Sequence, residues 1–307
     1  MMQPIPVSSG HPGNFRERVG HMDFYRPQNL ADALEIKAIH PEAHCISGGT
    51  DLMVEINFDR KRPEGLIDLS NIPELQGWKD LGDSIEIGSG MPYTKICEEL
   101  HEFLPGLAMA ARTVGSPQIR NKGGVGGNLG SASPAGDSHP ALLASGATVN
   151  VVNKSGSRAI DINDFFVGPK RNALTPDELI KSIVIPKATG GQQYSKVGTR
   201  NAMVIAVCSF GVAIHTDTKS VGTGIGSAGP TPLRAKEAEI YAAKHLDWQN
   251  FSTISDEVLK EFGQLVSRAA KPIDDVRGTA AYRRHSLAVI ASRCLKWAWS
   301  DTQKRGQ

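Results

Sequence analysis

The feature of this sequence that most constrains its fold is the glycine-rich segment 116–137, SPQIRNKGGVGGNLGSASPAGD. Six of its 22 residues are glycine, and four of these stand together at Gly123, Gly124, Gly126 and Gly127. Glycine has no Cβ atom, so consecutive glycines let backbone N–H groups approach a ligand closely. Successive N–H groups that point inward form a nest for oxyanions, most often phosphate. The segment is therefore predicted to be an anion-binding loop.

A second glycine turn, SGGTD at residues 47–51, offers the same device earlier in the chain. Its two glycines follow a short apolar strand, residues 43–46, and precede a hydroxyl residue that opens a helix. Two such nests suit a pyrophosphate held from both sides, and Asp137 is a suitable acceptor for ribose hydroxyls. The residues thus predict a dinucleotide site. Because the chain holds 32 glycines, two tight turns without a ligand remain the alternative.

Two common nucleotide motifs are missing from the sequence. Neither loop fits G-x-G-x-x-G after a strand with an acidic residue about 20 positions on, which argues against a Rossmann nicotinamide site. The P-loop pattern G-x-x-x-x-G-K followed by Ser or Thr is also missing. A net charge of +2 provides no basic field of the kind that nucleic acid requires. No apolar run approaches the roughly 20 residues of a membrane span.

The four cysteines and the first 21 residues bear on metal content and location. Cys45, Cys97, Cys208 and Cys294 stand far apart, without the close pairs typical of zinc or iron–sulfur sites. Reduced, buried thiols and no metal site are therefore predicted. Residues 1–21 hold proline, glycine and charge but neither an apolar signal region nor a twin arginine. We expect a disordered extension and a cytoplasmic protein.

The pattern of helices and strands predicts an α+β chain of two domains. Residues 22–191 alternate helices and strands, with Asn29 capping the first helix and Thr94 capping another that Pro105 ends. From Tyr194 the character changes to three strands followed by helices at 235–243, 257–270 and 285–299. The glycine pair at 190–191 marks the join, and the second domain is predicted to span residues 192–300.

Four stretches together resemble one known family. They are ISGGTDLM (46–53), VGSPQIRNKGGVGGNLGSASPAGDSHPALLASGA (114–147), YSKVGTRNAMVIA (194–206) and PIDDVRGTAAYRRH (272–285). Their order and spacing are similar to those of the FAD-binding (medium) subunit of molybdenum hydroxylases. That family includes the medium subunit of carbon monoxide dehydrogenase and the flavin part of xanthine dehydrogenase. The resemblance covers nearly the whole chain after the extension.

The resemblance implies a two-lobed FAD-binding domain of the vanillyl-alcohol-oxidase (PCMH) type, with lobes at about 22–75 and 76–191. A small α+β C-terminal domain with a three-stranded antiparallel sheet would follow. It implies non-covalent FAD bound by Ile46, Ser47, Gly48, Gly49, Thr50, Asp51, Leu52, Gly124, Val125, Gly126, Gly127, Asn128, Asp137, Ile180 and Lys196.

Several of these residues carry particular roles by the same resemblance. Ile180 matches an aliphatic residue that lies against the isoalloxazine ring, and Lys196 matches a lysine near the pyrimidine edge of the flavin. A cation there would favour the reduced flavin, because reduction puts electron density on that edge. Gly124 departs from the family, which usually has Thr or Ser at this position. One hydrogen bond to the cofactor, about 0.5–1.5 kcal/mol net, would then be missing.

The resemblance also implies an oxidoreductase subunit without catalytic residues for the substrate. Substrate would be oxidised on a separate large molybdenum-cofactor subunit, and electrons would arrive through a small 2Fe–2S subunit. FAD on this chain would pass them to an external acceptor such as NAD, within a heterotrimer that is itself dimerised.

Two rival readings remain from the sequence. A self-contained flavin oxidase of the same fold commonly has His in the first loop, where this chain has Thr50, and needs a larger substrate region. An assembly subunit without cofactor is the other, and Gly124 is its only support.

Overall fold

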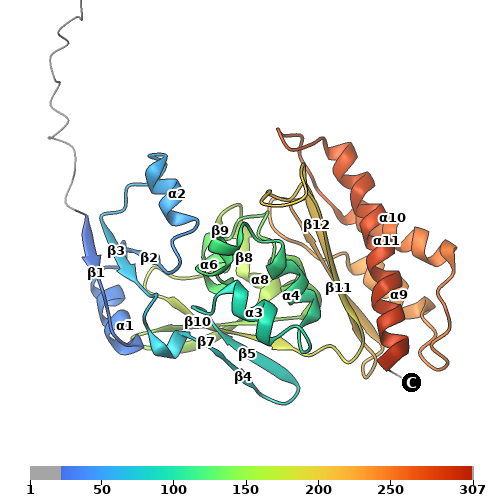
Figure 1. Ribbon diagram of the computed structural model, residues 1–307, viewed down its shortest axis with the longest axis horizontal. Helices are drawn as coiled ribbons and strands as arrows, with labels where there is room; N and C mark the ends of the chain where they lie inside the picture. Colours follow the sequence, from blue (N-terminus) through green and yellow to red (C-terminus); the bar gives the residue numbers. More distant parts are fainter. Residues whose placement is uncertain (1–21, 306–307) are drawn as a thin grey trace, which may run out of the picture.

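The computed structural model describes residues 22–305, and the predicted extension at residues 1–21 lies outside them. Three units follow one another along the long axis of the molecule (Figure 1). A small parallel sheet is at one end, a five-stranded antiparallel sheet is in the middle, and a three-stranded sheet with long helices is at the other end. In the described part of the chain, no helix has the length and apolar character needed to cross a membrane.

The first unit is a three-stranded parallel sheet with one helix packed on it. The strand order is β1 (Asp23–Tyr25), β3 (Gly65–Asp68), β2 (His44–Ile46). Helix α1 (Leu30–Ile39) buries Ala33 against Ile67, and the Asn29 side chain accepts a hydrogen bond from the Asp32 amide. The predicted cap is thereby confirmed. A second helix, α2 (Leu52–Asn57), stands away from this sheet (Figure 1).

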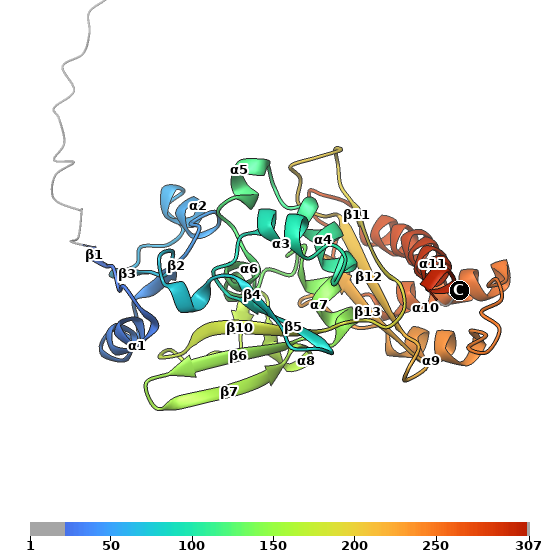
Figure 2. The same cartoon turned by 60° about the horizontal axis from the view of Figure 1, so that its bottom comes forward.

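The middle unit is built on a five-stranded antiparallel sheet. Its central strand, β10, comes last of the five along the chain. The strands, in spatial order, are β4 (Trp78–Asp80), β5 (Ser84–Gly88), β10 (Leu179–Pro186), β6 (Thr148–Asn153) and β7 (Gly156–Asp161). The chain also forms short helices and one hairpin in this unit: α3 (Tyr93–Glu99), α4 (Pro105–Arg112), α5 (Pro117–Arg120), α6 (Val125–Ser131), α7 (His139–Ser145), α8 (Ile162–Phe165), β8 (Phe166–Gly168) and β9 (Arg171–Asn172). Helices α3, α4, α5 and α6 lie above the sheet in Figure 2.

Two local predictions in this unit are wrong. Thr94 does not cap α3, because Pro92 occupies the N-cap and the Thr94 hydroxyl donates instead to the Asn121 side chain, at 2.6 Å. Pro105 begins α4 rather than ending α3, which stops at Glu99. Proline suits the first helical position because its missing N–H would have no helical acceptor there.

The third unit is the predicted three-stranded sheet followed by helices. The antiparallel order is β11 (Gln192–Val197), β12 (Cys208–His215), β13 (Ser220–Gly226). Three helices follow it: α9 (Lys236–His245), α10 (Asp256–Ala269) and α11 (Ala280–Arg305). The last helix is longer than predicted and buries Trp299 in a core with Phe210 and Phe262.

Strand β11 joins the third unit to the middle one through its two faces. On one face, Gln192 accepts a hydrogen bond from the Gly106 amide at 3.0 Å. On the other, the Gln193 side chain donates to Asp301 of α11 at 2.8 Å, and the Ser195 hydroxyl accepts from the Cys294 thiol at 3.1 Å. Because side chains alternate along a strand, one short strand serves both cores.

Candidate cofactor-binding site

The two glycine turns meet backbone to backbone. A methyl group on Gly48 would stand only 1.9 Å from the carbonyl oxygen of Lys122, and one on Gly123 would stand 3.1 Å from the Thr50 hydroxyl. The first turn leaves β2 and opens α2, while the second opens α6. Segments distant along the chain therefore form one continuous wall.

A cavity of about 610 Å³ lies between the small parallel sheet and the middle unit, along this wall. Its volume falls within the range of ligand pockets, about 300–1,000 Å³. Thirteen of the predicted site residues line it: Ile46, Ser47, Gly48, Gly49, Thr50, Asp51, Leu52, Gly124, Gly126, Gly127, Asn128, Asp137 and Ile180. Val125 and Lys196 do not line it. Val125 is buried in the core of the middle unit, and Lys196 lies behind Asp137.

Glycine occupies the positions of the second turn for different structural reasons. A methyl group on Gly124 would stand 2.3 Å from the Met91 carbonyl oxygen, and one on Gly126 would stand 2.4 Å from that of Ser89. Both are needed for close packing against the segment that follows β5. Gly127 has no atom within 4 Å of that position and faces open space. The departure at Gly124 thus has a cause in the packing of this chain, since the Met91 carbonyl occupies the space of a hydroxyl side chain.

Each glycine turn opens a helix at the wall of the cavity. The first helical hydrogen bond of α6 runs from the Asn128 amide to the Gly124 carbonyl, and that of α2 from Met53 to Gly49. Amides that precede these have no helical acceptor, as at any helix start. The backbone of Gly49 has φ = +69°, a conformation that glycine adopts without strain. The geometry therefore suits an anionic group between the turns.

Asp137 is a buried carboxylate at the cavity wall with a cation behind it. Its Oδ2 accepts from the Lys196 ammonium at 2.7 Å, and its Oδ1 lies 3.4 Å from the Tyr194 hydroxyl. The side chains of Asp137 and Lys196 are 11% and 7% exposed. Burial raises the pKa of the Asp137 carboxyl, although Lys196 acts in the opposite direction. Lys196 is thus a buried lysine rather than a solvated surface lysine. Asp137 does not cap α7, because Ser138 occupies the N-cap position.

A second chain of hydrogen bonds positions Asn128. The Tyr93 hydroxyl donates to Ser138 at 3.2 Å, and the Ser138 hydroxyl donates to the Asn128 amide oxygen at 2.7 Å. Burial raises the pKa of Tyr93, so its proton stays in place at neutral pH. The side chain of Asn128 is therefore held in one orientation at the cavity.

Ile180 reaches the cavity because β10 is irregular there. Its pairing with β6 shifts between Ile180 and Ser182, which is a β-bulge. Bulges redirect side chains and are common next to functional sites. Ile180, Val114 and Ile205 line the cavity together, and Ile205 comes from the loop that links β11 to β12. This gives the cavity an apolar part suited to a flat ring.

The structure also shows lining residues that were not predicted. Two groups of them come from the segment after β5 and from residues 172–179: Ser89, Gly90, Tyr93, Asn172, Leu174, Thr175, Pro176, Glu178 and Leu179. A signal for the first group exists, since GSG at residues 88–90 follows a strand as SGG does at residues 47–49. No local pattern marks the second group, which only the sheet brings to the cavity.

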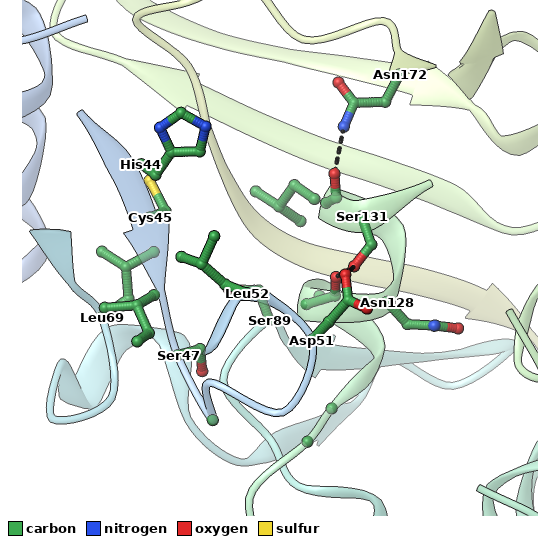
Figure 3. Close-up of a pocket in the computed structure, with 18 of the residues that line it drawn as sticks. His44, Cys45, Ser47, Asp51, Leu52, Leu69, Ser89, Asn128, Ser131 and Asn172 are labelled. Atoms are coloured by element: carbon green, nitrogen blue, oxygen red, sulfur yellow. Dashed lines mark hydrogen bonds between the residues drawn. The ribbon is translucent and has the colours of Figure 1, made fainter. Parts of the chain in front are cut away.

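The far part of the cavity carries polar groups from the first unit. His44 lines it, and none of the described residues offers its Nδ1 a hydrogen bond of good geometry. Burial lowers the pKa of His44, so its imidazole is neutral at pH 7. The side chains of His44 and Cys45 are seen at one side of the cavity and that of Asn172 at another (Figure 3).

Among residues 22–305, the cysteines and possible metal ligands form no second site. The four cysteines are free thiols, and burial raises the pKa of Cys208 and Cys294 to about 12. Within residues 22–305, no group of three or more His, Cys, Asp or Glu side chains is arranged to hold a metal ion.

Comparison with known proteins identifies the family. Residues 18–188 match the FAD binding domain in molybdopterin dehydrogenase, and residues 193–298 match the CO dehydrogenase flavoprotein C-terminal domain. The chain belongs to this family of FAD-binding subunits. Its cofactor is FAD, and it is the medium subunit of a molybdenum hydroxylase, an oxidoreductase.

Individual relatives agree with this assignment. The chain is 36% identical over 234 residues to the nicotinate dehydrogenase FAD-subunit of Eubacterium barkeri, covering 71% of this chain and 78% of the relative. It is 29% identical over 287 residues to the putative xanthine dehydrogenase FAD-binding subunit of Escherichia coli K12, covering 90% and 95%. The solved structure of reconstituted CO dehydrogenase from Oligotropha carboxidovorans superposes with a TM-score of 0.84 at 26% identity, over 92% and 99% of the two chains.

The residues present in the cavity fit FAD. The helix starts at the two turns suit its diphosphate, and the apolar group with Ile180 suits its ring. The open space before Gly127 leaves room for close approach. The fold and the cofactor predicted from the sequence are thereby confirmed.

Proposed function

We propose that this chain is the electron outlet of a molybdenum hydroxylase complex. A large molybdenum-cofactor subunit would oxidise the substrate, a small 2Fe–2S subunit would deliver electrons, and this chain would transfer them to an external acceptor such as NAD. The complex would be a dimer of heterotrimers in the cytoplasm. The relatives named as subunits of nicotinate and xanthine dehydrogenases support this arrangement.

The observation that carries the proposal is the convergence of two glycine turns from two lobes on one cavity. When bound, FAD supplies reversible redox chemistry that can accept and pass on electrons. The amides of residues 48–50 and 125–127 would hold its diphosphate, and Ile180 would lie against its ring. Binding would be non-covalent, because Thr50 stands where tethering relatives of this fold have His.

Lys196 and Asp137 would set the charge beside the cofactor. The ion pair is almost neutral as a whole, and its carboxylate faces the cavity. Asp137 would accept a hydrogen bond from a ribose hydroxyl, and Lys196 opposes the rise in the pKa of Asp137 that burial causes. Lys196 would favour added negative charge near the pyrimidine edge of the flavin only to the extent that Asp137 does not compensate it.

The test separates substrate oxidation from electron exit. We expect the isolated complex to be yellow, with flavin absorption bands that disappear on addition of the substrate of the molybdenum subunit. Removal of FAD by high salt should abolish electron transfer to NAD but leave transfer to an artificial dye that reacts at the other centres. Unchanged NAD reduction by the FAD-free complex would contradict the proposal.

A further inference from the structure

Helix α2 crosses one edge of the cavity and touches the opposite lobe through polar side chains. The Ser131 hydroxyl, at the end of α6, donates to Asp51 at 2.8 Å. The Lys170 ammonium, in the turn between β8 and β9, lies 2.6 Å from Glu55. Asp51 and Glu55 are four residues apart and so share one side of α2. Both line the cavity, as does Ser131.

Apolar packing does not hold α2 in this position. None of its side chains is fully buried, and Met53 and Val54 are 39% and 45% exposed. A helix of this length is not stable by itself in water. Segments with few buried apolar contacts open at low free-energy cost. The polar contacts of Asp51 and Glu55 are therefore expected to decide where α2 lies.

The opposite edge, by contrast, is well fixed. The Asn172 side chain donates to the Gly130 carbonyl at 3.0 Å, and the Lys170 amide donates to the Ala132 carbonyl at 3.1 Å. These bonds tie the β8–β9 hairpin to the end of α6. Figure 3 shows Asp51 and Ser131 pointing toward one another beside the bond from Asn172. A movable edge thus faces a rigid one.

We propose that Asp51–Ser131 and Glu55–Lys170 form a clasp that holds α2 over the bound cofactor and sets how fast the cofactor leaves. The proposal rests on FAD binding in this cavity. Opening the clasp would let α2 move away and expose the diphosphate region between the two turns. Gly48 precedes Asp51 in the chain, so the backbone contact between the two turns at Gly48 and Lys122 would remain in the open state.

The charge contact is expected to respond to salt and to charge reversal. The Lys170 side chain is 55% exposed, so mobile ions reach it, whereas that of Glu55 is 14% exposed. The hydrogen bond from Lys170 lowers the pKa of Glu55, which is ionised at neutral pH. Loss of an ion pair of this kind is expected to change the rate of FAD release by about two- to five-fold.

The experiment measures FAD release from the full chain by the rise in flavin fluorescence after dilution. Lys170→Glu and Glu55→Lys should each release FAD about two- to five-fold faster than wild type. The double variant, which restores an ion pair with reversed charges, should return toward the wild-type rate. High salt should accelerate release from wild type but not from the single variants. Glu261→Lys is the matched control, because Glu261 forms an exposed ion pair with Arg268 on α10 and should leave release unchanged.

A second readout does not depend on the cofactor. Hydrogen exchange of the α2 amides in the FAD-free chain should be faster in Lys170→Glu than in wild type, and slower again in the double variant. If FAD does not bind to the wild-type chain, the proposed function fails, and this exchange measurement still decides the clasp. Equal release rates and equal α2 exchange in wild type and Lys170→Glu would overturn the clasp.

Discussion

At the scale of single residues, the pair Asp137–Lys196 shows that a motif does not tell which of its residues contacts the cavity. Both residues were predicted as cofactor contacts, but only Asp137 lines the cavity. Lys196 lies behind it, and its ammonium also donates to the Thr113 carbonyl at 3.2 Å. The lysine therefore acts on the cavity through the carboxylate that it neutralises. A buried ion pair of this kind is costly to break, since each charge has lost its water.

Replacing Lys196 by Met should destabilise the chain strongly. Asp137 would remain buried without a cation, and such single removals cost about 3–5 kcal/mol. Urea unfolding of the variant measures the loss. The double variant Lys196→Met with Asp137→Asn should lose less than the sum of its two single variants, because no charge is left unpaired.

A control for this prediction is Lys187→Met, since Lys187 pairs with the exposed Asp80 at 2.7 Å. Exposed pairs contribute about 0–1 kcal/mol, so this variant should stay close to wild type. Similar losses of unfolding free energy for Lys187→Met and Lys196→Met would contradict the prediction. They would show that burial of the Asp137–Lys196 pair does not raise the cost of breaking it.

At the scale of elements, the second glycine turn combines two tasks that its sequence does not separate. Gly124 and Gly126 let α6 pack against the segment after β5, whereas Gly127 faces the cavity. The glycine-rich nest predicted from the sequence is thus divided between packing and ligand approach. The two tasks predict different outcomes for alanine variants at neighbouring positions.

Gly126→Ala should lower stability, and Gly127→Ala should lower FAD affinity. The new methyl at residue 126 would collide with the Ser89 carbonyl, 2.4 Å away, so we expect a loss of about 1–3 kcal/mol, as in overpacked cores. At residue 127 the methyl meets no protein atom but occupies cavity space. Alanine there should leave the free energy of unfolding unchanged or raise it by up to about 1 kcal/mol.

Thermal unfolding of the FAD-free chain and FAD titration distinguish the two effects. The reverse pattern, with weak FAD binding only in Gly126→Ala, would contradict this division of roles.

At the scale of the whole molecule, β11 makes the two domains depend on one another. Gln192 contacts the middle unit through Gly106, while Ser195 and Gln193 contact α11. The cavity also takes Ile205 from the third unit. Neither domain is therefore expected to unfold while the other retains the cofactor.

We expect FAD release and unfolding of the C-terminal domain to coincide in urea. Three of the four tryptophans, Trp248, Trp297 and Trp299, lie in that domain, so tryptophan fluorescence reports on it. Flavin fluorescence reports on the cavity. Gln192→Ala should lower both midpoints together, because it leaves the Gly106 amide buried without its acceptor. A tryptophan transition complete at a urea concentration where FAD is still bound would contradict this coupling.

The sequence by itself determined most of the elements and predicted the two glycine turns that meet at the cavity. Some features depend only on residues that are close together in the sequence. Examples are the alternating strand Ser84–Gly88, the cap at Asn29 and the two glycine turns. The four motifs in order also sufficed to predict FAD and the two-domain α+β fold. The predicted domain boundaries and individual cofactor contacts remain predictions.

Only the tertiary structure decided which predicted residues share the cavity and which support it from behind. The β10 bulge turns Ile180 inward, pairing with Asp137 buries Lys196, and the Met91 carbonyl requires glycine at residue 124. Thr94 and Pro105 were misjudged for the same reason, since a partner distant in sequence or a neighbouring helix decided their roles. Contacts between segments far apart along the chain leave no periodic trace in either of them, so no reading of one segment alone can predict them.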